Sequence, residues 1–219
     1  MPESLSSLLQ KAWRKLIVKH WDLIWLERDL SPPAPSGRPE ATLIVRELLA
    51  EDLSEARLGP YFGPRAAQYQ RMLAGGSRCY AALLPETQVV AGLMWGHVGR
   101  YFDADYFRCH FEAPGDCLYL FAGEVAPEHR GTTLPFRVMA HAWETAAHEG
   151  LRRVRVVVGD HNTPALRLHM HLGYREVGEF VRVHHWFRGV LVTSRTHRYT
   201  GERLSGIRDS ASPKPSSAV

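Results

Sequence analysis

Residues 117–136 read CLYLFAGEVAPEHRGTTLPF, and this stretch decides the fold. Its first nine residues are mostly apolar and β-favouring, which predicts a strand over 117–125. Pro127 and Gly131 interrupt that pattern, and apolar residues at helical spacing begin at Leu134. The sequence therefore predicts a strand, a short loop and a helix in direct succession.

The helix after this loop is expected over 134–149, where an apolar stripe faces the sheet and Gly150 ends the helix. Unpaired backbone N–H groups point outward from a helix N-terminus, and the helix dipole adds partial positive charge there. Arg130, just before the helix, contributes a full charge. The loop is therefore expected to bind an anion such as a pyrophosphate.

A second unit of the same kind follows. A strand is expected over 153–158 and a helix over 164–172, with Gly173 at its end. The helix begins in Asn162-Thr163-Pro164-Ala165, where Thr163 is the expected N-cap and Pro164 the first helical residue. Strands that alternate with helices, followed by paired strands over 175–186 and 191–199, predict an α/β (α+β) fold with a mixed central sheet.

The order of these motifs is Val-x-Pro-x-x-Arg-Gly, helix, strand, Asn-x-x-Ala-x-x-x-His-x-x-x-Gly-Tyr. It resembles the acetyl-CoA-binding core of the GCN5-related N-acetyltransferase (GNAT) superfamily. The resemblance covers residues 41–199 in layout and 117–174 in recognisable motifs. It implies helices on both faces of the sheet and parallel strands at 117–125 and 153–158 that diverge to admit pantetheine.

The same resemblance assigns the cofactor-binding residues. Acetyl-CoA, or another acyl-CoA, is the implied co-substrate, with Val125 bonding pantetheine through its backbone and 130–136 surrounding the pyrophosphate. The assigned residues are Val125, Ala126, Arg130, Gly131, Thr132, Thr133, Leu134, Pro135, Phe136 and Asn162.

Two residues depart from the family's Arg-x-x-Gly-x-Gly loop, because Thr133 and Pro135 occupy its glycine positions. Threonine has a Cβ where glycine lets the backbone approach closely, and proline has no N–H to donate to a phosphate. The hydroxyls of Thr132 and Thr133 could replace one donor. The sequence therefore predicts weaker CoA binding than a glycine-bearing loop would give.

Three residues are the catalytic candidates: His169, Glu124 and Tyr119. His169 stands where the family often has the tyrosine that protonates the departing thiolate, and a histidine can donate near neutral pH; a merely packed histidine is the alternative. Glu124 is preferred as general base over Asp116 and Tyr119, with a salt bridge as its alternative role. Strand alternation places Tyr119 and Glu124 on opposite faces unless a bulge intervenes.

The expected activity is transfer of an acyl group from acyl-CoA to an amine by direct attack. No cysteine lies in a nucleophile motif, which disfavours an acyl-enzyme. A non-catalytic acyl-CoA-binding or interaction module is the alternative, because the loop glycines and the tyrosine are missing. The acceptor is left open between a small molecule and a protein amine, and a homodimer is also left open.

The rest of the chain divides by composition. We expect an amphipathic helix and a short strand over 1–30, a Pro-rich linker over 31–40, the catalytic domain over 41–199 and a disordered tail over 200–219. Residues 99–114 are rich in aromatic side chains and are expected to form a long irregular loop.

Bulk properties limit the partners. The formal net charge of +4 suits an anionic nucleotide cofactor, while no nucleic-acid-binding signature supports a nucleic-acid partner. No apolar run is long enough to span a membrane and no secretion signal is found, so a cytoplasmic location is expected. The three cysteines form no Cys-x-x-Cys pair, so no metal site is expected and all three are read as buried thiols.

Overall fold

The computed structural model describes residues 18–31 and 43–204. The predicted N-terminal helix, nearly all of the Pro-rich linker and residues 205–219 of the predicted tail lie outside these ranges. The chain forms two compact units, which are described separately. The central unit comprises Asp29–Tyr101 and Glu112–Val156, and the terminal unit comprises Met1–Arg28, Phe102–Phe111 and Val157–Val219.

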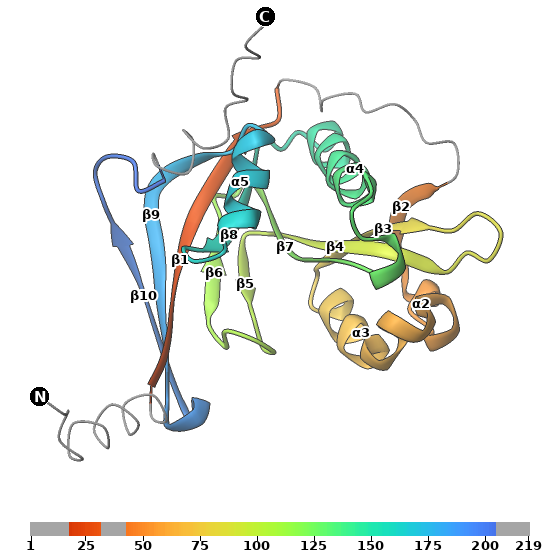
Figure 1. Cartoon of the computed structure of the whole chain (residues 1–219), viewed down its shortest axis with the longest axis horizontal. Helices are drawn as coiled ribbons and strands as arrows, with labels where there is room; N and C mark the ends of the chain where they lie inside the picture. The colour runs from red at the N-terminus through yellow and green to blue at the C-terminus, as the bar shows by residue number, and fades with distance from the viewer. Residues whose placement is uncertain (1–17, 32–42, 205–219) are drawn as a thin grey trace, which may run out of the picture. The chain divides into compact units, whose positions relative to one another are not determined.

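The central unit contains a mixed sheet in the order β8–β7–β4–β3–β2 (Figure 1). Neighbouring strands run antiparallel except β7 and β8, which are adjacent and parallel, as predicted. The strands are β2 (Ile44–Leu48), β3 (Arg78–Leu83), β4 (Val90–Val98), β7 (Cys117–Val125) and β8 (Arg153–Gly159).

The pairing of β7 with β8 is short. Its register runs from Cys117, opposite Arg153, to Leu120, opposite Val156. Strand β7 continues beyond this register to Val125 while remaining paired with β4 on its other side. The last five residues of β7 are therefore outside the parallel ladder, which is the divergence that the sequence predicts.

Strand β7 contains a bulge where it pairs with β4. Trp95 lies opposite Phe121 and Leu93 lies opposite Glu124, so two residues of β7 face the single residue Met94. Ala122, the first residue of the bulge, has a φ of 47°. An extra residue reverses the alternation of every side chain that follows. Glu124 consequently lies on the same face as Tyr119 and Phe121.

Helices cover both faces of this sheet, as expected (Figure 1). Helix α4 (Leu134–His148) packs on one face through a buried apolar stripe. Helices α2 (Glu55–Phe62) and α3 (Ala66–Ala74) pack on the other, where Tyr69 lies 5.5 Å from Trp95 between ring centroids. Because of the bulge, Glu124 points to the α2 and α3 side.

Close backbone packing anchors the start of α4. A Cβ built on Gly92 would lie 2.4 Å from Cδ2 of Leu134 and 3.2 Å from the carbonyl oxygen of Glu124. Leu134 is 1% exposed, so its side chain has no free space to move into. Glycine is therefore required at position 92 for the first turn of α4 to rest on β4.

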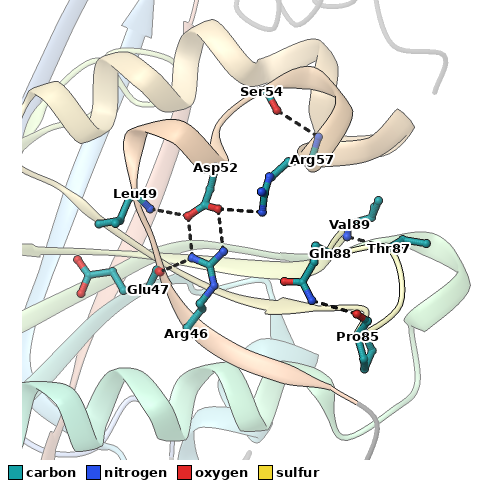
Figure 2. A network of polar contacts seen from close by, with 10 residues as sticks. All are labelled: Arg46, Glu47, Leu49, Asp52, Ser54, Arg57, Pro85, Thr87, Gln88 and Val89. Carbon is teal, nitrogen blue, oxygen red and sulfur yellow. Dashed lines mark hydrogen bonds and ion pairs between the residues drawn. The ribbon is translucent and has the colours of Figure 1, made fainter.

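A buried carboxylate organises the chain entering α2 (Figure 2). Asp52 accepts two hydrogen bonds from Arg46, at 2.6 and 2.7 Å, and one from the backbone N–H of Leu49 at 3.0 Å. The bond to Arg46 is the main cause that lowers the pKa of Asp52 to about 2. Ser54 then caps α2 by accepting from the N–H of Arg57, so α2 begins at Glu55.

The terminal unit is built on three antiparallel strands. Strand β9 (Arg175–Trp186) pairs on one side with β1 (Val18–Asp29) and on the other with β10 (Leu191–Arg198). Strand β1, with 12 residues, is longer than the short strand predicted within 1–30. Leu204, which was placed in the predicted tail, is 3% exposed and its N–H donates to Glu176 at 2.8 Å, so residues 200–204 are ordered.

Residues 99–114 are not a wholly irregular loop. They contain a two-stranded hairpin, β5 (Arg100–Phe102) and β6 (His110–Glu112). Asp103 shapes the connection, because its carboxylate accepts from the N–H groups of Tyr106 and Phe107 at 2.8 and 3.0 Å. Each of these strands has only three residues, which is too few for an alternating pattern to predict it.

Candidate functional site

The predicted cofactor residues 125–136 follow one another along the end of β7, the 3₁₀ turn η3 (Pro127–His129) and the start of α4. The N–H of Ala126 donates to the carbonyl of Ala91 at 3.0 Å, and Ala126 is 2% exposed. Gly131 has a φ of 78°, a conformation that suits glycine, and it turns the chain toward α4. The loop is thus fixed at the end of β7.

The first turn of α4 offers few donors. Thr132 Oγ1 accepts from the N–H of Leu134 at 3.3 Å and donates to the carbonyl of His129 at 2.7 Å. Thr133 is the N-cap residue, without a side-chain capping bond, and Pro135 has no N–H. Phe136, the next residue, packs against Trp143 with ring centroids 6.4 Å apart. Thr132 thus uses one N–H, so fewer donors remain for a pyrophosphate than a glycine loop would supply.

The side chain of Arg130, which is predicted to bind the pyrophosphate, contacts Val125 and Tyr61 in this structure. Its Nε donates to the carbonyl of Val125 at 3.3 Å, and its Nη2 donates to the hydroxyl of Tyr61 at 3.2 Å. The guanidinium also lies over the Tyr61 ring, 5.8 Å from the centroid. It is therefore directed to α2, on the face of the sheet that carries Glu124.

Glu124 is the centre of a polar cluster at the end of β7. Its Oε1 accepts from Arg65 in an ion pair, and its Oε2 accepts from the hydroxyl of Tyr61 at 3.4 Å. The Glu124 side chain is 33% exposed, so an incoming molecule can reach it. We call Tyr61, Arg65, Glu124 and Arg130 the Glu124 cluster.

Arg65 is held by aromatic rings. Its guanidinium carbon lies 5.4 to 5.5 Å from the ring centroids of Tyr61, Phe62 and Tyr69. Guanidinium groups are attracted to aromatic faces at this range. The ion pair with Glu124 raises the pKa of Arg65. The three aromatic rings thus hold the Arg65 guanidinium in place, and the guanidinium in turn orients the Glu124 carboxylate.

The other two acid or phenol candidates are placed less favourably. Tyr119 shares the face of Glu124 but is 2% exposed, and it stacks on Phe121 with ring centroids 5.3 Å apart. Asp116 lies just before β7, at the opposite end from Glu124, and pairs with Arg153 at 2.6 Å. That bond lowers the pKa of Asp116. Tyr119 is thus excluded by its burial and Asp116 by its place at the other end of β7, which leaves Glu124 as the candidate base.

Two predicted site residues belong to the terminal unit. Asn162, not Thr163, is the N-cap of α5 (Thr163–His171), because Asn162 Oδ1 accepts from the N–H of Ala165 at 3.3 Å. His169 is on the same helix. Its Nδ1 lies 2.8 Å from the carbonyl oxygen of Ala165, and its ring packs edge-on against Tyr174 with centroids 5.1 Å apart.

The contact with Ala165 determines the protonation of His169. A carbonyl oxygen only accepts, so Nδ1 carries the proton and Nε2 of the neutral ring is an acceptor. Burial lowers the pKa of His169. Only the imidazolium form, which burial disfavours, could donate a proton from Nε2.

The sequence reading missed Tyr61 and Arg65. Their importance depends on contacts with Glu124, which is about sixty residues away in sequence. A weak signal was present, because Tyr61, Arg65 and Tyr69 recur every four residues. In one continuous helix that spacing would place the side chains on one face. In the structure, Tyr61 lies on α2, Arg65 in the 3₁₀ turn Gly63–Arg65 and Tyr69 on α3.

The described residues also bear on other kinds of site. Within 18–31 and 43–204, no group of three or more His, Cys, Asp or Glu side chains is placed to hold a metal ion. Cys79, Cys109 and Cys117 are buried thiols, as expected, and burial raises the pKa of Cys109 to about 11. In the same part of the chain, no helix is both long and apolar enough to cross a membrane.

Comparisons with solved structures show the fold. A GCN5-related N-acetyltransferase from Sphaerobacter thermophilus matches with a TM-score of 0.52 at 14% identity, over 86% of this chain and 58% of that one. A tandem GNAT protein from the clavulanic acid biosynthesis pathway matches with a TM-score of 0.52 at 16% identity, over 84% and 59%. This chain thus spans less than two thirds of either structure. No curated protein matches it.

Residues 43–174 match the family described as Acetyltransferase (GNAT) family. The matched region is more than half of the chain and contains β7, the loop, α4, β8 and α5. The parallel pair β7 and β8, whose ladder ends before β7 does, agrees with that assignment. The chain belongs to the GNAT acetyltransferase family.

Proposed function

We propose that this chain transfers an acyl group, in the first instance acetyl, from acyl-CoA to an amine, with Glu124 as the general base. The observation that carries the proposal is the placement of Glu124. Its carboxylate is half-exposed, held by Arg65 and Tyr61, and located at the part of β7 that is free of β8. A GNAT domain is expected to bind acyl-CoA as the acyl donor, and Glu124 would be the base that takes the proton from the amine.

The proposed reaction is a direct substitution at the thioester carbon. The amine nitrogen forms a bond to that carbon, the carbon–sulfur bond breaks, and CoA leaves as thiolate. The proton lost by the nitrogen goes to Glu124, directly or through one water, and the thiolate takes up a proton. Orientation and proton transfer are the contributions expected of the protein.

The cofactor residues keep their predicted roles in this proposal, but the role of Arg130 has less support than the others. The backbone of Val125 and Ala126 would hold pantetheine, and residues 131–136 and Asn162 would contact the rest of the cofactor. Arg130 now contacts Tyr61 and Val125, so its part in pyrophosphate binding is the least supported. Tyr119, which is buried, would support the face beneath Glu124 rather than contact the acceptor.

His169 stays the proposed proton donor to the thiolate, under one condition. Its Nδ1 is engaged by Ala165, so donation has to come from Nε2 of the imidazolium. Since burial lowers the pKa of His169, that form becomes scarcer as the pH rises.

Three further expectations from the sequence stay predictions: a cytoplasmic location, a homodimer and the domain boundaries.

A specific observation favours a second candidate, a module that binds acyl-CoA without turnover. The first turn of α4 has Pro135 in place of a donor and Leu134 bonded to Thr132, so the family's phosphate loop is altered. The Glu124 cluster has no evident use in such a module, which is why catalysis is proposed first.

The decisive experiment crosses a panel of acyl-CoA donors with a panel of amines and measures free thiol release, while calorimetry measures CoA binding. Turnover above the background without enzyme, for at least one pair, is expected. Binding of CoA without thiol release for any amine would favour the module, and absence of CoA binding would contradict both candidates.

A further inference from the structure

The guanidinium of Arg65 lies among groups that bind organic cations. Its carbon is 5.4 to 5.5 Å from three aromatic ring centroids, and its Nη1 donates to a carboxylate. Aromatic faces attract ammonium and guanidinium ions, and a carboxylate supplies the opposite charge. We call this set of groups the cation cage; it comprises Tyr61 and Phe62 of α2, Tyr69 of α3 and Glu124 of β7.

Arg65 is attached to the cation cage by few polar contacts. Among residues 18–31 and 43–204, its side chain forms one hydrogen-bonded ion pair, from Nη1 to Oε1 of Glu124, although a guanidinium carries five N–H groups. The Arg65 side chain is 31% exposed, and contact with water weakens an ion pair. The guanidinium can therefore leave the cage for solvent at a modest cost.

The cation cage also contains a polar atom that Arg65 does not use. The hydroxyl of Tyr69 is buried and has no hydrogen-bond partner in the described part of the chain. Buried hydroxyl groups normally have such a partner. Burial raises the pKa of Tyr69, so the hydroxyl stays uncharged. The present occupant of the cage thus leaves one of its polar groups unsatisfied.

The cation cage and the proposed base share an atom, Oε1 of Glu124. In the proposed reaction Glu124 takes a proton from the acceptor nitrogen, so that nitrogen has to come within hydrogen-bonding distance of the carboxylate. Oε1 receives such a contact from Nη1 of Arg65. Nη1 therefore occupies a place that suits the nitrogen of an acceptor.

We infer that the cation cage is the subsite for the ammonium group of the acceptor, and that Arg65 occupies it in the free protein until the acceptor displaces it. This inference rests on the proposed function. The acceptor is an alkyl amine that arrives as its ammonium ion. The ammonium releases one proton to water through Glu124, and the neutral amine then attacks as described above. Because Arg65 competes for the same place, it weakens the apparent affinity for the acceptor.

The first test measures cation binding without turnover. The probes are choline and 3,3-dimethylbutan-1-ol, which has the same shape but no charge, and ligand-observed NMR follows their methyl signals. Arg65→Met keeps an unbranched apolar side chain and removes the competing charge. It should bind choline about tenfold to a hundredfold more tightly than the wild type, as expected if the cage is open in about 1 to 10% of wild-type molecules. Binding of the alcohol should not change.

Two further variants and a control accompany this measurement. Arg65→Gln should act in the same direction as Arg65→Met. Addition of Glu124→Gln to Arg65→Met should reduce the preference for choline over the alcohol, because the cage then has no carboxylate. Arg71→Met is the matched control, since Arg71 is exposed on α3 and its side chain donates to the carbonyl of Ala67 at 3.3 Å. It should leave choline binding at the wild-type level.

The second test uses turnover. With an amine that the wild type acylates, Arg65→Met should lower the KM for the amine by a factor similar to the gain in choline affinity, and kcat/KM should rise. If Arg65 only orients Glu124, the same variant should instead lower kcat and leave the KM unchanged.

Three results would overturn the inference. Choline binding that is no tighter in either Arg65 variant, while turnover persists, would remove the cation subsite and leave the proposed function intact. A lower kcat with an unchanged KM for the amine in Arg65→Met would make Arg65 a positioning residue for Glu124. No thiol release with any amine, despite CoA binding, would remove the proposed function and with it the assignment of the bound cation as the acceptor.

Discussion

The hydroxyl of Tyr61 donates to Oε2 of Glu124 across 3.4 Å and so joins α2 to the end of β7. This contact exists because the bulge at Ala122 turns Glu124 to the side of the sheet that α2 covers. A regular strand would have directed the same carboxylate toward α4. The face on which the proposed base lies thus depends on the way β7 pairs with β4 through this bulge.

Glu124→Gln should lower kcat/KM by about a hundredfold to ten-thousandfold, the usual range for losing a general base. Glutamine keeps the size of the side chain, its Oε1 still accepts from Arg65, and its Nε2 can donate to the hydroxyl oxygen of Tyr61, so the fold and the Kd for CoA should change little. Steady-state kinetics and calorimetry measure the two quantities. Glu144→Gln, on the exposed side of α4, is the control. Wild-type kinetics in Glu124→Gln would exclude Glu124 as the base.

Ala122→Gly should stabilise the protein by about 1 kcal/mol, because a left-handed conformation is strained for alanine and free for glycine. Ala122→Val should destabilise it, since a β-branched residue tolerates this conformation less well. Denaturant unfolding gives the free energies. A stabilising valine would contradict the strain argument.

Pro135→Ala should tighten CoA binding by about tenfold, because it restores one backbone donor at the start of α4 worth about 1 to 2 kcal/mol. The double change Thr133→Gly with Pro135→Gly should act in the same direction by also admitting a closer backbone approach. Calorimetric titration with CoA measures the Kd. An unchanged Kd in both variants would mean that the cofactor is not held by this turn.

His169→Phe should lower kcat by about tenfold to a thousandfold without changing the Kd for CoA, if His169 donates the proton. His169→Tyr should retain more activity. The pKa of His169 is lowered from 6.5, so the imidazolium decreases as the pH rises through that lowered value. The ratio of wild-type to variant kcat should therefore be largest at acidic pH and shrink toward 1 above neutrality. A ratio independent of pH would assign His169 a packing role only.

Asp52→Asn should cost about 2 kcal/mol of unfolding free energy near pH 7, as the lowering of its pKa from 3.8 to about 2 indicates. A carboxyl whose pKa is lowered on folding stabilises the fold above its unfolded pKa. That contribution is lost as the pH falls from about 4 to about 2. Unfolding curves at pH 7 and pH 2.5 should show the difference between wild type and variant shrinking at the lower pH. An equal difference at both would show that the carboxylate charge is not its cause.

The sequence predicted those features that follow from local patterns. Apolar periodicity and the breaks at Pro127, Gly131 and Gly150 located β7, α4 and their connecting loop, and motif order predicted the parallel pair of β7 and β8. These signals are local, because periodicity and turn residues act over a few positions.

Other features were beyond such patterns. The bulge places an alanine, not a glycine, at a positive φ, so the residue type gave no warning. The ion pair of Arg65 with Glu124 joins distant segments, and no single-sequence rule pairs them. The direction of Arg130 toward Tyr61 likewise depends on tertiary packing. The roles of the site residues that the sequence named stay predictions, and the contacts of those residues follow from the fold.

The packing of Leu134 against Gly92 has a consequence for the entropy of binding. Residues 126–133 are tied at one end by the bond of Ala126 to Ala91 and at the other by Leu134, which rests on Gly92. Folding thus orders this segment before any ligand arrives, so association need not pay again for its conformational freedom. Any side chain at position 92 would displace Leu134 and loosen this end of the segment. The affinity for CoA would then fall, although residue 92 itself does not contact the cofactor in the proposed site.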